Sequence, residues 1–321
     1  MLTKKLTTTL LTLLAAIGLF SSAAIAAYPD RVITLIVPFG TGGSTDTNAR
    51  LLATEVEKVL GQRIIVKNIS GAAGLTGTKA VADAKPDGYT FGYLPPAVLV
   101  MHPHVRKVAY TIDDFDPVAI AVSFPYTLFT QKEGGFADLD DMVKKMQTDS
   151  SRYFVGSTGV GSMPYFAIMG LLTHYNIKPQ LVQFKTDGDA MNAMMGNRIS
   201  LYASTPMIDA MYDSKALVVL DNKRSKFMPE VKSINEYGQD MNFVHWQAVM
   251  APNGTPKQHL DIFSAAIKKV SSDPGYQNTL AKIRMAPDYK SPEETRQYIL
   301  DQNAMYKVVT KEVMDAIKAQ N

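Results

Sequence analysis

The 321-residue sequence contains no cysteine. This absence excludes disulfide bonds, thiolate metal sites, cysteine nucleophiles and lipid attachment at cysteine. A strong net charge is missing too. The formal net charge is +3, which is too small to indicate a nucleic-acid-binding protein. With 46% hydrophobic and 20% charged residues, the composition is that of a globular protein large enough for two domains. The cores of these domains must supply the stability that disulfides would supply in a small secreted protein.

One apolar run lies near the start of the chain, and no second one follows. Lys4 and Lys5 precede the apolar residues 10–20, and the small residues "AIA" follow at 24–26. This pattern is typical of a secretory signal peptide, and the run is well under the roughly 20 residues that span a bilayer. We predict a signal peptide at residues 1–26, cleaved before Ala27, and a soluble protein exported to a bacterial periplasm.

Strand and helix patterns alternate along the chain. Residues 31–38, 63–68 and 89–94 are β-branched or alternating runs typical of strands, and helical spacing separates them, with Gly61 as a cap of the first helix. The order recurs at 152–204, where a strand followed by a glycine loop at 152–162 and strands at 180–184 and 199–204 enclose two further helices. The pattern predicts two α/β domains of the doubly wound, parallel type.

Two segments are too long for a single ordinary strand or turn. Residues 116–131 and 242–252 are therefore interpreted as crossover segments between the domains. On this interpretation the second domain is an insertion: domain 1 comprises 27–124 plus 247–321, and domain 2 comprises 125–246. The helical tail from residue 256 to 321 is expected to pack back on domain 1.

Three glycine-rich loops follow predicted strands and precede predicted helices: "GTGGST" at 40–45, "SGAAGLTG" at 70–77 and "GSTGVGS" at 156–162. Open α/β sheets bind ligands at this edge, and the unpaired N–H groups of a helix N-terminus favour an anion. Ser44, Thr45 or Asp46 is predicted to cap the first helix. A single loop of this kind is as often a plain tight turn, but three at equivalent positions favour a shared ligand cleft.

The sequence lacks the common nucleotide-binding and catalytic motifs. The glycine loops match neither G-x-G-x-x-G nor the P-loop, and no H-E-x-x-H or G-x-S-x-G occurs. His102 and His104 in "HPH" are interpreted as loop residues, and His174 and His245 as structural. Trp246, the single tryptophan, is assigned to the core, with a place beside the cleft as the alternative. We predict no catalytic residue, no metal and no cofactor.

Three motifs carry a family resemblance: "YPDRVITLIVPFGTGGSTDTNARLLA", "VKNISGAAGLTGTKAVADAKPDGYT" and "APNGTP". They resemble the periplasmic solute-binding receptors of tripartite tricarboxylate transporters, often called the Bug family, from residue 28 to about 256. The resemblance implies a monomeric two-domain binding protein of the type II, Venus-flytrap class. It also implies mostly parallel sheets flanked by helices and two crossover strands as the hinge.

The resemblance also implies a set of ligand-binding residues. In the family, backbone N–H groups of the first-domain loops grip a carboxylate, and hydroxyl and glycine residues of the second domain close on it. Carried over, the positions are Phe39, Thr41, Gly42, Ser44, Asp46, Ala73, Gly74, Thr76, Gly156, Ser157, Thr158, Gly161, Ser162, Tyr165, Ser204 and Thr205.

The second domain departs from the family pattern at three places. Tyr165 stands where relatives usually have histidine, "FKTDG" (184–188) replaces the usual "YKG", and Ser204, beside Thr205, replaces an aspartate. These changes predict a less charged wall and a carboxylate with an aromatic or apolar body, rather than a citrate-like polyacid or an amino acid.

The predicted function is therefore a receptor that captures a small carboxylate, an aromatic or weakly polar mono- or dicarboxylate. It would deliver this ligand to the permease subunits of a tripartite tricarboxylate-type transporter. Two alternatives remain open at this point. One is an exported α/β enzyme acting on a carboxylate, and the other is a receptor that feeds a membrane sensor kinase.

Overall fold

A computed structural model describes residues 28–159, 161–209 and 211–320; the predicted signal peptide lies outside them. The description below concerns the unit that begins at Arg31. Within the described part, none of the helices combines the length and apolar character needed to cross a membrane.

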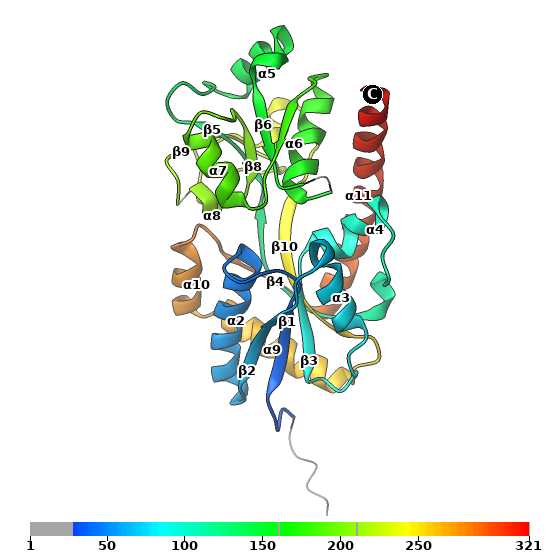
Figure 1. Ribbon diagram of the computed structural model, residues 1–321. Coiled ribbons are helices and arrows are strands. Elements are labelled where there is room, and N and C mark those ends of the chain that lie inside the picture. Colours follow the sequence, from blue (N-terminus) through cyan, green and yellow to red (C-terminus); the bar gives the residue numbers. More distant parts are fainter. Residues whose placement is uncertain (1–27, 160, 210, 321) are drawn as a thin grey trace, which may run out of the picture. The chain divides into compact units, whose positions relative to one another are not determined.

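The larger sheet has six strands in the order β11-β4-β10-β3-β1-β2. Figure 1 labels β4, β10, β3, β1 and β2. Strand β1 pairs in parallel with β2 and β3, whereas β10 is antiparallel to β3 and β4, and β11 is antiparallel to β4. The strands are β1 (Ile33–Val37), β2 (Ile64–Asn68), β3 (Thr90–Leu94), β4 (Phe115–Pro125), β10 (Val244–Pro252) and β11 (Pro287–Lys290).

Both faces of this sheet are covered, which explains the continuous apolar run in β1. Ile33, Leu35 and Val37 belong to a core shared with α2 and α9, while Ile36 belongs to the other large core, which includes residues of α3, α6 and α11. Strand β2, at the sheet edge, exposes alternate residues instead. The C-terminal cap predicted at Gly61 is present, with the residue in the left-handed conformation (φ 69°).

The second group of strands forms a three-stranded antiparallel sheet, β8-β5-β9, and a parallel pair, β6-β7. An isolated parallel bridge between Val155 and Leu201 connects the two. The strands are β5 (Thr127–Gln131), β6 (Phe154–Ser157), β7 (Gln180–Gln183), β8 (Tyr202–Ser204) and β9 (Ser214–Val219). We call the part built on the six-stranded sheet the first lobe, and the part built on these strands the second lobe.

Helices flank the sheets of both lobes. The long C-terminal helix α11 packs on β4 of the first lobe and on α6 of the second (Figure 1), so the tail packs on more than the first lobe. The helices are α2 (Ser44–Leu60), α3 (Leu75–Ala82), α4 (His102–Val105), α5 (Leu139–Thr148), α6 (Met163–His174), α7 (Asp187–Met195), α8 (Pro206–Asp209), α9 (Lys257–Ser271), α10 (Pro274–Ala281) and α11 (Pro292–Gln320).

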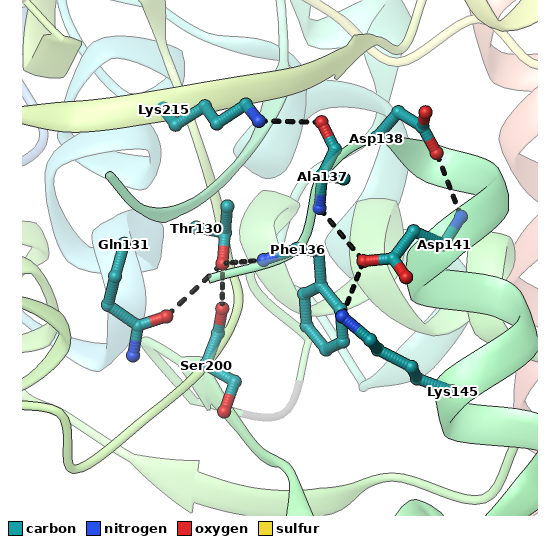
Figure 2. Close-up of polar contacts among 9 residues, drawn as sticks. All are labelled: Thr130, Gln131, Phe136, Ala137, Asp138, Asp141, Lys145, Ser200 and Lys215. Carbon is teal, nitrogen blue, oxygen red and sulfur yellow. Dashed lines mark hydrogen bonds and ion pairs between the residues drawn. The ribbon is translucent and has the colours of Figure 1, made fainter. Parts of the chain in front are cut away.

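A connection in the second lobe, between β5 and α5, is held by polar contacts to neighbouring strands (Figure 2). The Thr130 hydroxyl donates to the carbonyl of Ser200 at 2.8 Å and accepts the N–H of Phe136 at 3.4 Å. Lys215 on β9 donates to the carbonyl of Ala137 at 2.6 Å. These contacts attach the loop to β5 and β9.

The α/β fold is confirmed, with one difference in strand direction. The strand–helix–strand units are parallel as expected, but β4, β10 and β11 in the first lobe and β5, β8 and β9 in the second pair antiparallel, so the sheets are mixed. The two long segments of the sequence are the connecting strands: β4 continues through Tyr126 into β5, and β10 returns the chain to the first lobe.

Candidate functional site

A cleft of about 490 Å³ lies between the two lobes. Such a volume suits a small organic molecule. The first lobe contributes loops at the ends of β1, β2 and β3, and the second lobe contributes the ends of β6 and β7. The lining residues are Phe39, Gly40, Gly43, Ser44, Thr45, Asp46, Ala73, Pro95, Ala97, His102, Arg106, Tyr126, Thr158, Gly159, Gly161, Ser162, Met163, Pro164, Lys185, Thr186, Asp187 and His245.

The N-terminus of α2 opens into this cleft without a side-chain cap. The residue at the cap position is Gly43, so the predicted caps Ser44, Thr45 and Asp46 are instead the first three helical residues. Their N–H groups have no acceptor within the helix, because helical hydrogen bonds begin one turn later. The helix therefore presents unpaired donors and the positive end of its dipole to the cleft.

Asp46 organises the loop that precedes α2. Its buried carboxylate accepts the N–H of Gly42 at 2.9 Å and the amide of Asn68 at 2.9 Å, and it pairs with Arg50. Burial acts to raise the pKa of Asp46, but the hydrogen bonds from Arg50, Gly42 and Asn68 outweigh it and leave the pKa below its usual value. The charge of Asp46 is thus neutralised by its own lobe.

The helices of the second lobe that face the cleft carry their own caps. The Ser162 hydroxyl accepts the N–H of Tyr165 at 3.3 Å at the start of α6. The Thr186 hydroxyl accepts the N–H of Asp189 at 3.1 Å at the start of α7. The first lobe therefore provides the more open anion site, because an N–H already bonded to a cap is not available to a ligand.

His102 and Arg106 reach from the first lobe to the glycine loop of the second. A Cβ atom at Gly161 would lie 2.6 Å from Arg106 Nη2, so this side chain lies directly on the loop. Burial, together with the charge of Arg106, lowers the pKa of His102 to about 4 against the opposing effect of a hydrogen bond with the Gly161 backbone. The histidine is neutral at physiological pH, and Arg106 supplies a positive charge to the cleft wall.

The connecting strands contribute Tyr126 and His245 to the floor of the cleft. Asn48 donates to Gln247 Oε1 at 3.0 Å, and Gln247 Nε2 donates to His245 Nε2 at 3.3 Å. The imidazole proton is therefore on Nδ1, which faces the Tyr126 hydroxyl at 3.5 Å. Burial lowers the pKa of His245 to about 4. His245, interpreted from the sequence as structural, thus contacts both the interior and the cleft.

The structure brings part of the predicted set to the cleft. The predicted residues among its lining are Phe39, Ser44, Asp46, Ala73, Thr158, Gly161 and Ser162. The others that were carried over from the resemblance lie outside the lining: Thr41, Gly42, Gly74, Thr76, Gly156, Ser157, Tyr165, Ser204 and Thr205. Ser157 and Ser204 are fully buried behind the cleft wall, and their hydroxyls have no partner among the described residues.

Tyr165 is the most consequential of these differences. It is the third residue of α6 and is buried in the core against Phe166, and burial raises its pKa. Met163 and Pro164, the first two residues of α6, line the cleft instead. The charged residues Lys185 and Asp187 also line the cleft, so the expectation of a less charged second-lobe wall cannot be based on Tyr165 and Ser204.

Several lining residues were missed or misinterpreted from the sequence. Lys185 and Asp187 follow β7, so the rule that ligands bind at strand ends would have found them. His102 lies on a short helix rather than a loop, and only the contact between the lobes places it in the cleft. Trp246, in contrast, is fully buried in β10 as predicted.

Comparison with known proteins shows the family of the chain. The family model described as "Tripartite tricarboxylate transporter family receptor" matches residues 48–314. The chain belongs to this receptor family. Its relatives include the Bordetella pertussis protein BugT, 29% identical over 326 residues that cover 95% of this chain and 98% of BugT.

Solved structures of similar fold include two from Rhodopseudomonas palustris. MatC, solved with bound malate, is 26% identical with a TM-score of 0.77, and the match covers 88% of this chain and 99% of MatC. A protein solved with adipate is 25% identical with a TM-score of 0.81, over 89% of this chain and 98% of that protein. Members of this receptor family are periplasmic solute-binding proteins, and the resemblance inferred from the glycine-loop motifs is confirmed.

Proposed function

We propose that this chain is a periplasmic receptor that captures a small carboxylate between its lobes and delivers it to a tripartite tricarboxylate-type permease. The observation that carries the proposal is the N-terminus of α2, which faces the cleft without a side-chain cap. The carboxylates named for the two R. palustris structures support the ligand class. The proposed domains are 27–124 plus 247–321 and 125–246, with β4 and β10 as the hinge.

The preference for an aromatic body that the sequence predicted loses its basis. It rested on Tyr165 and Ser204, and neither lines the cleft. The cleft instead contains the charged side chains of Arg106, Lys185 and Asp187. We therefore propose a small polar carboxylate as the ligand.

Proline substitution of Ser44 tests the proposed contact. Ser44 is the first residue of α2, where proline is tolerated and removes one N–H, and Gly43 before it already has the extended backbone that a proline requires. We expect Ser44→Pro to weaken carboxylate binding by about 10- to 100-fold, the value of a hydrogen bond to a charged group. Titration calorimetry with the tightest-binding acid from a screen of small carboxylates measures the change.

Ser44→Ala is the matched control, because it removes the hydroxyl but keeps the N–H. We expect its affinity to stay within a few-fold of the wild type. Equal affinity of Ser44→Pro and wild type would remove the α2 N-terminus from the site. If no carboxylate binds the wild-type protein at all, the proposed function itself fails.

We further propose that the receptor does not alter its ligand chemically. We also propose that it is located in the periplasm after cleavage of a signal peptide before Ala27. An acid incubated with the protein should be recovered unchanged, whereas consumption would favour the exported-enzyme alternative. Loss of uptake in a strain lacking the gene, restored by the wild-type chain, would support delivery to a permease. Intact uptake together with a lost transcriptional response would favour the sensor alternative.

A further inference from the structure

One carboxylate in the cleft forms no ion pair with any residue that the structure describes, although Arg106 and Lys185 line the same cleft. Asp187, the first residue of α7, lines the cleft from the second lobe. Among the described residues its side chain has one hydrogen-bond partner, the Tyr202 hydroxyl, which donates to Oδ1, and it forms no ion pair. A carboxylate in a cleft that binds carboxylates has to be explained, because two negative charges in one cleft repel each other.

The contact with Tyr202 shows that the position of Asp187 is built into the lobe. Tyr202 on β8 is fully buried, and its hydroxyl also interacts with the side chain of Thr158, another cleft residue. The phenol proton is committed to Asp187 Oδ1, which orients the carboxylate and leaves Oδ2 to whatever occupies the cleft. Burial raises the pKa of Asp187 and of Tyr202, because a charged side chain at either position loses hydration that a partner would have to replace.

The two lobes therefore differ in what they offer a ligand. The first lobe offers the free donors of Ser44, Thr45 and Asp46, while its own acid is neutralised by Arg50, Asn68 and Gly42. The second lobe, whose α6 and α7 are already capped, offers a free acceptor. A carboxylate fits the donors, and only a hydrogen-bond donor fits the acceptor.

We propose that Asp187 selects the far end of the ligand, so that the receptor prefers a carboxylate whose other end carries a hydroxyl or ammonium group over one with a second ionised carboxylate. This inference rests on the proposed function, since it assumes that the first lobe holds the ligand carboxylate. It assigns to Asp187 a role in specificity.

Two matched series of acids test the proposal. The four-carbon series is butyrate, 4-hydroxybutyrate, 4-aminobutyrate and succinate, and the six-carbon series is hexanoate, 6-hydroxyhexanoate, 6-aminohexanoate and adipate. Within a series the members differ only at the far end. By titration calorimetry at pH 7.5 we expect the hydroxy or amino acid to bind at least about tenfold more tightly than the dicarboxylate and the unsubstituted acid.

Asp187→Asn supplies the decisive variant. Asparagine keeps the size and an oxygen for the Tyr202 hydroxyl, but it presents an N–H₂ donor where the carboxylate was an acceptor. We expect the order of affinities to reverse, with the dicarboxylate gaining and the hydroxy or amino acid losing about 10- to 100-fold relative to each other. A purely structural role of Asp187 would weaken all members of a series alike.

Asp213→Asn is the control, because it makes the same charge change on an exposed acid of the second lobe, which pairs with Lys132 and lies outside the cleft lining. It should leave the order unchanged. A wild-type preference for the dicarboxylate, or an order that Asp187→Asn does not alter, would overturn the inference while leaving carboxylate binding intact. If Asp187→Asn fails to fold, the wild-type order within the two series decides the question. Absence of binding across both series would contradict the proposed function instead.

Discussion

At the scale of single residues, the most informative side chains are two acids of the cleft with different surroundings. Asp46 and Asp187 both line the cleft. Asp46 is held by Gly42, Asn68 and Arg50, which leaves its pKa below the usual value. Burial raises the pKa of Asp187, whose one hydrogen-bond partner in the described part of the chain is Tyr202. The same residue type therefore organises a loop in one lobe and remains open to a ligand in the other.

Removal of the Asp46 carboxylate should disorder the first glycine loop. We expect Asp46→Ala to lower the free energy of unfolding by about 2 kcal/mol, because the Gly42 N–H and the Asn68 amide lose their acceptor. Binding of the carboxylate ligand should weaken at least about tenfold, because the loop N–H groups are no longer held in place. Urea denaturation and titration calorimetry measure the two effects.

Glu55→Ala is the control for this change, since Glu55 is a solvent-accessible acid of the same helix paired with Lys58 at 2.7 Å. A surface pair of this kind contributes at most about 1 kcal/mol. Unchanged binding by Asp46→Ala would show that the loop keeps its conformation without the carboxylate.

At the scale of elements, the close approach of α3 to the end of β1 explains the second glycine loop. Gly77 in α3 lies against the chain at Ile69 and Pro38. A Cβ atom there would be 2.4 Å from the Ile69 carbonyl oxygen and 2.6 Å from Pro38 Cα. This glycine allows the helix to pack on the strand end, which positions the neighbouring residue of the cleft, Ala73, on the same loop.

Gly77→Ala should therefore destabilise the fold. Both nearest atoms belong to the backbone, so they cannot rotate away, and we expect a loss of about 2 to 3 kcal/mol with a melting temperature several degrees lower. Gly40→Ala is the control, because a Cβ atom at Gly40 meets nothing within 4 Å. Differential scanning calorimetry compares the two variants, and equal melting temperatures would contradict the packing explanation.

At the scale of the whole molecule, the connecting strands combine the hinge with part of the cleft. His245 on β10 stacks on Phe124 of β4, with ring centroids 5.1 Å apart, and faces Tyr126 at the junction to β5. The buried His245 makes the stability of the whole chain depend on pH, because its imidazole binds a proton far more weakly in the folded state than in the unfolded state.

The direction of this dependence follows from the lowered pKa. Burial lowers the pKa of His245 from 6.5 to about 4, so between these values the unfolded chain binds a proton that the folded chain does not. The stability is complete above about pH 6.5 and falls as the pH decreases towards 4, by about 3 kcal/mol for this residue. His102 acts in the same direction.

Chemical denaturation between pH 4 and 8 measures this effect. His245→Gln keeps a hydrogen-bonding side chain at the position and should make the decline shallower. The same substitution at His174, an exposed residue at the end of α6, should leave the slope as it is in the wild type. An unchanged slope in His245→Gln would assign the acid sensitivity to other groups.

The alternation of strands and helices, the glycine loops at strand ends and the family can be derived from the chain alone, because they depend on local patterns. Ser44, Asp46 and Thr158 were placed in the cleft in this way.

Contacts between segments distant in the sequence decide the rest. They set the direction of β4, β10 and β11 and the positions of His102, Arg106, Asp187 and His245. Tyr165 illustrates the limit: one helical residue turns about 100° from the next, so the motif located the helix but only core packing decided that Tyr165 faces inward and Met163 the ligand.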